Sequence, residues 1–146
     1  METQETTDVM EATEKHVESL QGALTPEQAN AIKASASSAT TGYAANGSVA
    51  SLIFYQKWQV VIKDGGKTFN GNAGGISTPG GGALFGTVYT SDINRLYSDT
   101  HSFSFNSVSV YTNVLFYDKH SNYLGTFQAG GLSTVAGNGG GTGSWS

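Results

Sequence analysis

The sequence predicts an all-β protein whose main domain is a closed barrel of eight antiparallel strands, with one short helix and a largely disordered N-terminal tail. Three observations lead to this prediction. Every tryptophan, tyrosine and phenylalanine lies at or after Tyr43. Apolar and polar residues alternate through most of that region, with the period of two that a half-buried strand requires. The same region is approximately duplicated, which turns a unit of about four strands into eight.

The first 42 residues differ in composition from the rest and are expected to form an acidic, flexible tail. They contain seven acidic and two basic residues, a net charge of −5, and no aromatic residue. Thr25-Pro26-Glu27-Gln28 has the features of a helix start, and Ser35–Gly42 is a low-complexity linker. This segment has too little apolar surface to fold alone, so we expect most of it to be disordered. The alternative is a segment that folds on a partner.

Residues 43–146 are the predicted barrel domain. Asn46-Gly47-Ser48 matches a glycosylation sequon and is interpreted as a turn in the linker. From Ser48 onward a strand is expected, with an apolar face formed by Leu52, Phe54, Trp58, Val60 and Ile62. Lys63–Lys67 predicts a hairpin turn, because glycine adopts the positive φ that such a turn requires. A strand through Phe69, a glycine-rich break near residues 79–82 and a strand over 83–90 complete the first half.

One short helix is expected between the halves. Ser91 or Asp92 can cap it, and Ile93, Leu96 and Tyr97 then fall on one helical face.

The second half repeats the strand pattern. Its apolar residues change from odd to even positions at Asn106-Ser107, which predicts a bulge or bend between two strands. Strands over 123–135 and 140–145 end the domain.

An internal repeat supports the barrel. Ala73–Thr78 matches Ala129–Thr134 at an offset of 56 residues, and Tyr55 matches Tyr111 at the same offset. The two copies cover about residues 50–90 and 106–146. Eight antiparallel strands can close into a small barrel, and closure removes the exposed edges that a chain with few charges protects poorly. The alternative is convergent use of glycine in two strands.

The composition argues against several functional classes. Without cysteine the chain has no disulfide, thiolate nucleophile or Cys-ligated metal site. No apolar run reaches the roughly 18–20 residues of a transmembrane helix. A net charge of −4 without a cluster of Lys or Arg argues against electrostatic binding to nucleic acid or acidic lipid. The N-terminus has no apolar h-region, so we expect either an intracellular protein or a mature exported form that has lost its signal peptide.

No catalytic constellation is evident, and we expect a protein that is not an enzyme, needs no cofactor and binds no metal. Four carboxylates of the predicted barrel suit structural roles in turns and at the helix ends: Asp64, Asp92, Asp99 and Asp118. We interpret Asp118-Lys119-His120 as a solvated turn rather than a weak metal site. A hydrolase that brings two of these acids together is the least favoured alternative.

Surface aromatic residues are the remaining candidates for binding. Five tyrosines are expected to point outward among Ser, Thr, Asn and Gly residues: Tyr55, Tyr89, Tyr111, Tyr117 and Tyr123. A neutral surface with aromatic rings suits carbohydrate, lipid headgroups or protein better than catalysis. The alternative is that the tyrosines only cover the barrel and its ends.

Several motifs, in order along residues 47–146, resemble the virulence-associated proteins (Vap family) exported by an actinobacterial pathogen of macrophages. The motifs of the first half are Ser51–Gln56, Phe69–Gly75 and Gly81–Thr87. Asp92–Thr100 is similar to the mid-body helix of the family. Leu132–Val135 and Gly139–Trp145 are similar to its C-terminal signature.

The resemblance implies a compact, protease-resistant barrel of two Greek-key halves with no ligand pocket inside. It implies a protein that is secreted or at the cell surface after loss of its signal peptide, and that acts in the host phagosome without catalysis. For at least one member this means a disturbance of endolysosomal maturation linked to membrane lipid. The expected partner is therefore host membrane lipid or a host protein, with the chain as a monomer. The family offers no catalytic residues to carry over.

Two main functions follow. The leading one is a virulence-associated barrel that binds host membrane lipid or a host component through its surface. The alternative is a small-ligand carrier of the calycin or avidin kind, since an eight-stranded barrel can hold a ligand if its interior is not filled. An axis filled by Leu52, Phe54, Trp58, Val114 and Phe116 would argue against the carrier.

Overall fold

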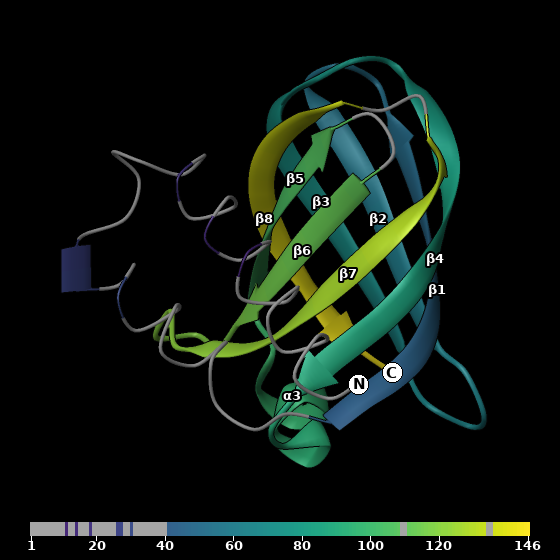
Figure 1. Ribbon diagram of the computed structural model, residues 1–146. Coiled ribbons are helices and arrows are strands. Elements are labelled where there is room, and N and C mark those ends of the chain that lie inside the picture. Colours follow the sequence, from purple (N-terminus) through teal and green to yellow (C-terminus); the bar gives the residue numbers. More distant parts are fainter. Residues whose placement is uncertain are drawn as a thin grey trace.

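The computed structural model describes residues 41–108, 111–133 and 136–146, together with six residues of the N-terminal segment: 11, 14, 18, 26, 27 and 30. The elements in these ranges are β1 (Thr41–Ser51), β2 (Tyr55–Ile62), β3 (Thr68–Ser77), β4 (Gly80–Thr90), α3 (Ile93–Asp99), β5 (Ser102–Val108), β6 (Tyr111–Tyr117), β7 (Tyr123–Ser133) and β8 (Gly137–Trp145). The strands form one closed antiparallel barrel in the order β1-β2-β3-β8-β5-β6-β7-β4 (Figure 1). The predicted barrel with one short helix is confirmed. Of the predicted helix start, Pro26 and Glu27 are described and helical, whereas Thr25, Gln28 and most of the predicted linker lie outside the described residues.

Both halves of the barrel have the same strand order. In the first half β4 pairs with β1, which is followed by β2 and β3, and in the second half β8 pairs with β5, which is followed by β6 and β7. An order of fourth, first, second and third strand is that of a Greek key. The pairs β3–β8 and β4–β7 join the two halves, so each described strand has a neighbour on both sides.

The barrel has two different ends. β1 starts beside the end of β4, where Thr41 pairs with Thr90, and α3 follows directly at this end (Figure 1). The helix begins as predicted, because the Asp92 side chain accepts the N–H of Arg95 at 3.0 Å, and the Leu96 side chain is fully buried. At the opposite end Ser51 pairs with Gly80. The chain turns there between β1 and β2 and between β3 and β4.

Aromatic side chains fill the interior. The ring centroid of Trp58 in β2 lies 4.9 Å from that of Phe105 in β5, and Phe69 in β3 lies 5.0 Å from Phe116 in β6. The Trp145 ring, in β8, lies 5.5 Å from Phe69. Of these three strand pairs only β3–β8 is hydrogen-bonded, so the first two contacts cross the interior of the barrel.

The predicted first strand has the wrong boundaries. The structure ends β1 at Ser51, turns at residues 52–54 and starts β2 at Tyr55. Leu52 and Phe54 are therefore exposed in a turn and do not fill the barrel axis, whereas the other three residues of the predicted apolar face, Trp58, Val60 and Ile62, are buried. Hydrogen bonds to distant residues hold this turn, and they leave no turn signal in the local sequence.

Two further boundaries differ from the prediction. Asn46-Gly47-Ser48 lies within β1, not in a linker turn, because a glycine there lets the strand pass over a core ring: a Cβ at Gly47 would meet the Phe127 side chain at 2.8 Å. β5 does not bend at Asn106-Ser107 but continues to Val108, and the Ser107 hydroxyl pairs with that of Thr112 at 2.7 Å. Residues 109–110, between β5 and β6, lie outside the described residues.

Candidate functional site

The five predicted surface tyrosines do not gather in one place. Tyr55 lies on β2 and is half exposed, and its hydroxyl donates to Asn72 Oδ1 at 2.6 Å. Tyr89, on β4, and Tyr111 and Tyr123, at the starts of β6 and β7, are partly buried. Tyr117 is only 7% exposed, so the expectation of an exposed ring is wrong for this residue.

Burial changes the chemistry of three of these tyrosines. It raises the pKa of Tyr117 to about 12, against the opposing effect of a hydrogen bond with Ser104. The pKa values of Tyr111 and Tyr123 are also raised by burial, and the Tyr111 hydroxyl donates to Gln128 Oε1. These rings are packed against the barrel, so Tyr55 is the most accessible of the five.

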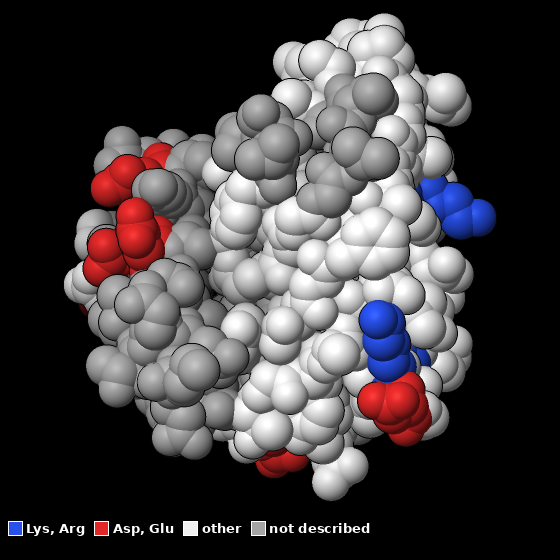
Figure 2. All heavy atoms as spheres, turned by 45° about the vertical axis from the view of Figure 1, so that its right-hand side comes forward, with Lys and Arg blue, Asp and Glu red and all other residues white. Residues whose placement is uncertain are grey.

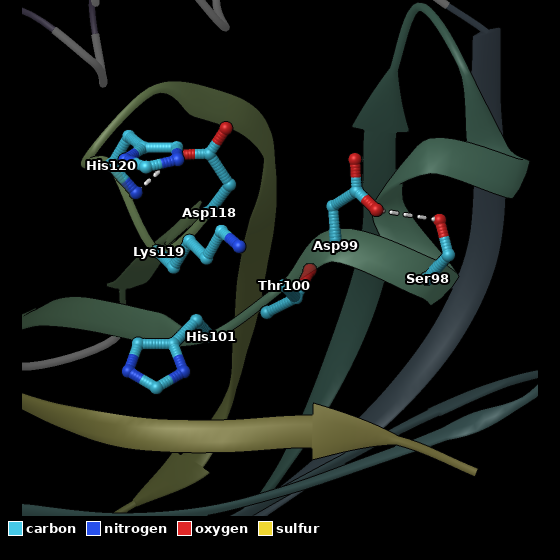
Figure 3. Close-up of a pocket in the computed structure, with 7 residues that line it drawn as sticks. All are labelled: Ser98, Asp99, Thr100, His101, Asp118, Lys119 and His120. Atoms are coloured by element: carbon cyan, nitrogen blue, oxygen red, sulfur yellow. Dashed lines mark hydrogen bonds between the residues drawn. The ribbon is translucent and has the colours of Figure 1, made fainter.

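A shallow pocket lies at the end of the barrel that carries α3. Figure 3 shows its lining residues, which come from the C-terminal end of α3 and from the turn after β6: Ser98, Asp99, Thr100, His101, Asp118, Lys119 and His120. The Ser98 hydroxyl donates to Asp99, which also forms an ion pair with Arg95 at 3.7 Å. Across residues 41–108, 111–133 and 136–146, no three His, Asp or Glu side chains are placed to share a metal ion.

Asp118 is engaged in holding its own turn. Its Oδ1 accepts the N–H groups of His120 at 2.8 Å and Asn122 at 2.9 Å, and its Oδ2 accepts from the Asn122 amide at 3.1 Å. Burial by itself would raise the pKa of Asp118, but these hydrogen bonds and the Arg95 guanidinium, 3.4 Å away, outweigh it and lower the pKa from its ordinary value of 3.8. This carboxylate stabilises the turn, as predicted from the sequence.

The turn between β1 and β2 is the most distinctive exposed feature of the described structure. Leu52, Ile76 and Phe54 are the most exposed of the described large apolar side chains, at 77%, 72% and 70%. The N–H of Phe54 donates to the carbonyl of Leu52 at 3.0 Å, and Ile53 between them has a φ of 77°. A three-residue turn with positive φ is rare and strained, above all for a β-branched residue.

Three buried polar residues hold this strained turn, and we call them the Gln56 cluster: Ser51, Gln56 and Ser77. The Gln56 amide donates to the Ile53 carbonyl and to the Ser77 hydroxyl, both at 2.9 Å. The Ser51 hydroxyl accepts the N–H of Ile53 at 3.2 Å, and the N–H of Ser77 donates to the Ile53 carbonyl at 3.0 Å. Strain of this kind persists only where the surroundings fix it, and it is concentrated at functional sites.

Charges are distributed unequally between the two ends of the barrel. Nearly all charged side chains described from residue 41 onward lie at the end of the barrel that carries α3. They are in the β2–β3 turn, around α3 and in the turn after β6: Lys63, Asp64, Lys67, Asp92, Arg95, Asp99, Asp118 and Lys119. Lys57, within β2, is the exception among these residues. The opposite end, formed by turns 52–54 and 78–79 and the adjoining strand ends, has no charged side chain among its described residues, and we call it the charge-free end. In the view of Figure 2 the upper tip of the molecule is white.

No described helix has the length and hydropathy of a membrane span.

The residues of this turn carry no local turn signal. Ser-Leu-Ile-Phe-Tyr continues the period of a strand and contains no glycine or proline. The one available clue is Gln56. The alternation of strand residues places this polar side chain on the same face as the buried Trp58 and Val60. A buried amide needs partners, and the nearest groups able to supply them are in a tight turn.

Comparison with known proteins identifies the family. A family model described as Rhodococcus equi virulence-associated protein matches residues 2–146. The chain is similar to the solved structure of the virulence-associated protein VapD from the intracellular pathogen Rhodococcus equi, with 41% identity, a TM-score of 0.72, and coverage of 73% of this chain and 98% of that one. It is also similar to VapB from the same organism, with 44% identity, a TM-score of 0.69, and coverage of 74% and 98%. No protein with a curated description matches at a significant level. Because the family model spans nearly the whole chain and the two solved structures share its barrel, the chain belongs to the Rhodococcus equi virulence-associated protein family.

Proposed function

We propose that the protein is an exported, non-enzymatic virulence-associated protein that acts in the host phagosome by binding host membrane lipid or another host component through its charge-free end. Membership in a virulence-associated family supports a role in infection. The observation that supports this mode of action is the turn at Leu52 and Phe54, whose side chains are held in solvent by the buried Gln56 cluster.

The energetics favour an apolar partner for this turn. Burial of a leucine or phenylalanine side chain contributes about 1.5–3 kcal/mol each, so Leu52 and Phe54 together offer a substantial gain. Because the Gln56 cluster already fixes the turn, little conformational entropy is lost when it binds. Aromatic side chains favour the interface of a bilayer and apolar ones favour its hydrocarbon core, whereas a charged side chain is costly in the core, which fits the insertion of an end without charges.

The carrier alternative is less well supported. A barrel that carries a ligand needs space inside, but the rings of Trp58, Phe69, Phe105 and Phe116 pack across the interior of this one. A partner that binds on the outside is more compatible with this packing.

A non-enzymatic role is supported by the engagement of the acids. Asp92 caps α3, Asp99 pairs with Arg95, and Asp118 accepts four hydrogen bonds. A paired-carboxylate hydrolase needs one acid free to donate a proton and a second carboxylate facing it.

Co-sedimentation with vesicles tests the binding mode. The full chain is mixed with phosphatidylcholine vesicles, with and without phosphatidylserine, at pH 7 and pH 5. We expect the chain to sediment with vesicles, and the double variant Leu52→Ser/Phe54→Ser to lose most of this binding. The matched control is Val61→Ser/Phe85→Ser, which removes two exposed apolar side chains from the barrel wall and should bind like the parent. A parent chain that neither sediments with any vesicle nor retains a host protein on an affinity column would refute the proposal.

Export is tested separately. The protein is expected in the culture filtrate or on the surface of the organism that encodes it, and its recovery only from the cytoplasmic fraction would contradict that part of the proposal.

A further inference from the structure

The exposed amide side chains of the barrel are concentrated on one part of its wall. Strands β2, β3 and β8 are neighbours in the barrel. Among the described strand residues, every exposed asparagine and glutamine belongs to one of these three strands: Gln59, Asn70, Asn72 and Asn138. Those of the other described strands are buried or half-buried, and the outward residues of β1 and β4 are mostly small or apolar.

The register of β2 and β3 arranges these side chains in three rows. Gln59 lies opposite Asn70, Lys57 opposite Asn72, and Tyr55 opposite Gly74. All six residues lie on the exposed outer side of the wall, and we call them the amide face. The first two rows continue onto β8 with the exposed residues Ser144 and Thr142. Since neighbouring strands are about 4.8 Å apart and successive rows roughly 7 Å, the face has room for several sugar rings.

The charge of the amide face excludes most ionic partners. Strands β2, β3 and β8 contain no acidic residue, and Lys57 is their one basic residue. One lysine gives little charge complementarity to a polyanion, and the absence of carboxylates on these strands gives none to a polycation. An amide group, in contrast, presents both a hydrogen-bond acceptor and donors, which matches the paired hydroxyl groups of an uncharged sugar.

Two hydrogen bonds between side chains fix the face in advance. The Tyr55 hydroxyl donates to Asn72 Oδ1 at 2.6 Å, and the Gln59 amide donates to Asn70 Oδ1 at 3.2 Å. Both bonds use the carbonyl oxygens of the asparagines, so their NH₂ groups remain available to a ligand. Because these side chains are already ordered, less conformational entropy is lost when a ligand binds.

Gly74 is the residue that points to a ligand on this face. The next residue, Gly75, is explained by the fold, since it has a φ of 128° and a Cβ there would meet the Asn138 carbonyl oxygen at 2.7 Å. Gly74 has no positive φ, and a Cβ there would have nothing within 4 Å. A glycine within a strand lowers stability, and one that the packing does not require is typical of a position where a ligand approaches the backbone.

We propose that the amide face binds an uncharged oligosaccharide, with one sugar ring over Gly74 and against the ring of Tyr55.

The chemistry of Tyr55 suits this role. It lies directly opposite Gly74, and its side chain is half exposed beside the open space that the glycine leaves. The face of an aromatic ring is negative and apolar, so it attracts the C–H groups of a sugar ring while the surrounding amides bind its hydroxyls. The inference does not rest on lipid binding at the charge-free end, and the vesicles that test lipid binding contain no sugar.

A titration followed by NMR tests the site in the full chain. Four neutral probes are added to the ¹⁵N-labelled protein, each up to about 10 mM: maltotetraose, cellotetraose, mannotetraose and N-acetylchitotetraose. We expect at least one to bind with a Kd of about 1 mM or lower and to shift the signals of Asn72, Gly74 and the Asn70 side-chain amide, while the signals of α3 stay in place. No shift on the amide face with any of the four would overturn the proposal.

Two variants test the assigned residues. Gly74→Leu fills the open space and Tyr55→Ala removes the ring, and each is expected to weaken binding by about tenfold or more. Ala44→Leu, which adds the same side chain at an exposed position of β1, is the matched control and should bind like the parent.

Emission from the buried Trp58 and Trp145 reports whether each variant is folded. Unchanged affinity in a folded Gly74→Leu variant would contradict the assignment. If that variant does not fold, Tyr55→Ala decides the question in the same way.

A sulfated tetrasaccharide from heparin tests the competing class of ligand. We expect it to bind no more tightly than the best neutral probe, since Lys57 is the one cation of the amide face. Binding of the sulfated probe alone, with loss in Lys57→Ala and in high salt, would show that the face recognises an anion and would overturn the proposal.

Discussion

Single residues at the charge-free end show how a strained exposed turn is kept in place. Ile53 adopts a positive φ that costs a β-branched residue on the order of 1–3 kcal/mol. Gln56, fully buried, compensates by donating to the Ile53 carbonyl and to Ser77. The exposed Leu52 and Phe54 therefore depend on a side chain that is not itself accessible.

Removal of the Gln56 amide is predicted to loosen the turn. Gln56→Ala leaves the Ile53 carbonyl and the Ser77 hydroxyl with fewer partners in a buried position, so we expect a loss of about 2–3 kcal/mol in the free energy of unfolding, measured in urea. Gln59→Ala, three residues away on the exposed face of β2, is the control and should cost less than about 0.5 kcal/mol. Binding to vesicles should weaken only in Gln56→Ala. Equal stability of the two variants would show that the turn does not depend on the cluster.

Asp118 makes stability depend on pH at the other end of the barrel. Its pKa is lowered in the folded state, so its contribution is present above the unfolded pKa of 3.8 and is lost as the pH falls through the folded value. We expect Asp118→Ala to cost about 2–3 kcal/mol at pH 7, because a buried carboxylate with several hydrogen bonds is removed. The difference between variant and parent should shrink below pH 3.8, as measured by urea unfolding at each pH. Asp99→Ala, which breaks a half-exposed ion pair, should cost less than about 1 kcal/mol. A difference for Asp118→Ala that persists unchanged in acid would contradict this account.

At the scale of elements, glycines allow neighbouring strands to approach closely. A Cβ at Gly141 in β8 would collide with the Asn72 carbonyl oxygen of β3, whereas a Cβ at Gly74 in β3 has nothing within 4 Å. These two strands pair along most of their length and join the two halves of the barrel. The same strand pair thus contains one glycine that the packing requires and one that it does not.

Alanine at these two positions is predicted to have opposite effects. Gly141→Ala forces β3 and β8 apart, so we expect it to destabilise the barrel by about 3 kcal/mol or more, or to prevent folding. Gly74→Ala removes backbone freedom from the unfolded chain at no steric cost, so it should be neutral or stabilising by up to about 1 kcal/mol. Thermal unfolding of both variants tests the pair. Similar melting temperatures would mean that the close approach at Gly141 is not structurally important.

The elements also show which features local sequence can predict. The helix α3 and the β2–β3 hairpin carry their own signals, Asp92 as cap and Asp64 and Gly65 with positive φ, and both are predictable from them. The β1–β2 turn is not, because the groups that fix it are far away along the chain: Ser77 is 21 residues from Gln56. The sequence predicts a break near glycines 80–82, but these residues lie in β4 and pair with β1. A glycine-rich stretch is compatible with a turn or with a closely packed strand, and the local sequence does not show which of the two forms. Tyr117 is expected outside for the same reason: alternation does not show what covers an outward face.

At the scale of the whole molecule, the repeat and the topology agree in period. An offset of 56 residues places the first residue of β2, Tyr55, on that of β6, Tyr111, and places Thr41–Ser51 over most of β5. The duplication itself stays a prediction, as does the division at residue 42. The two halves nevertheless do not produce a molecule with equivalent ends, because α3 and the turns around it carry nearly all of the charge in the described barrel.

This asymmetry predicts how vesicle binding depends on salt and pH. Since the charge-free end has no charged side chain among its described residues, its affinity should change by less than about twofold between 50 and 500 mM NaCl, whereas a basic patch would lose affinity steeply over that range. Acidification from pH 7 to pH 5 should have an equally small effect, because His101 and His120 lie at the other end and Asp118, whose pKa is lowered, stays ionised. The measurement is a vesicle titration at each salt concentration and pH, with neutral and anionic lipid in parallel. Binding that requires anionic lipid and disappears in high salt would place the interaction at the charged end and would refute the assignment to Leu52 and Phe54. The described cations of that end are Lys63, Lys67, Arg95 and Lys119.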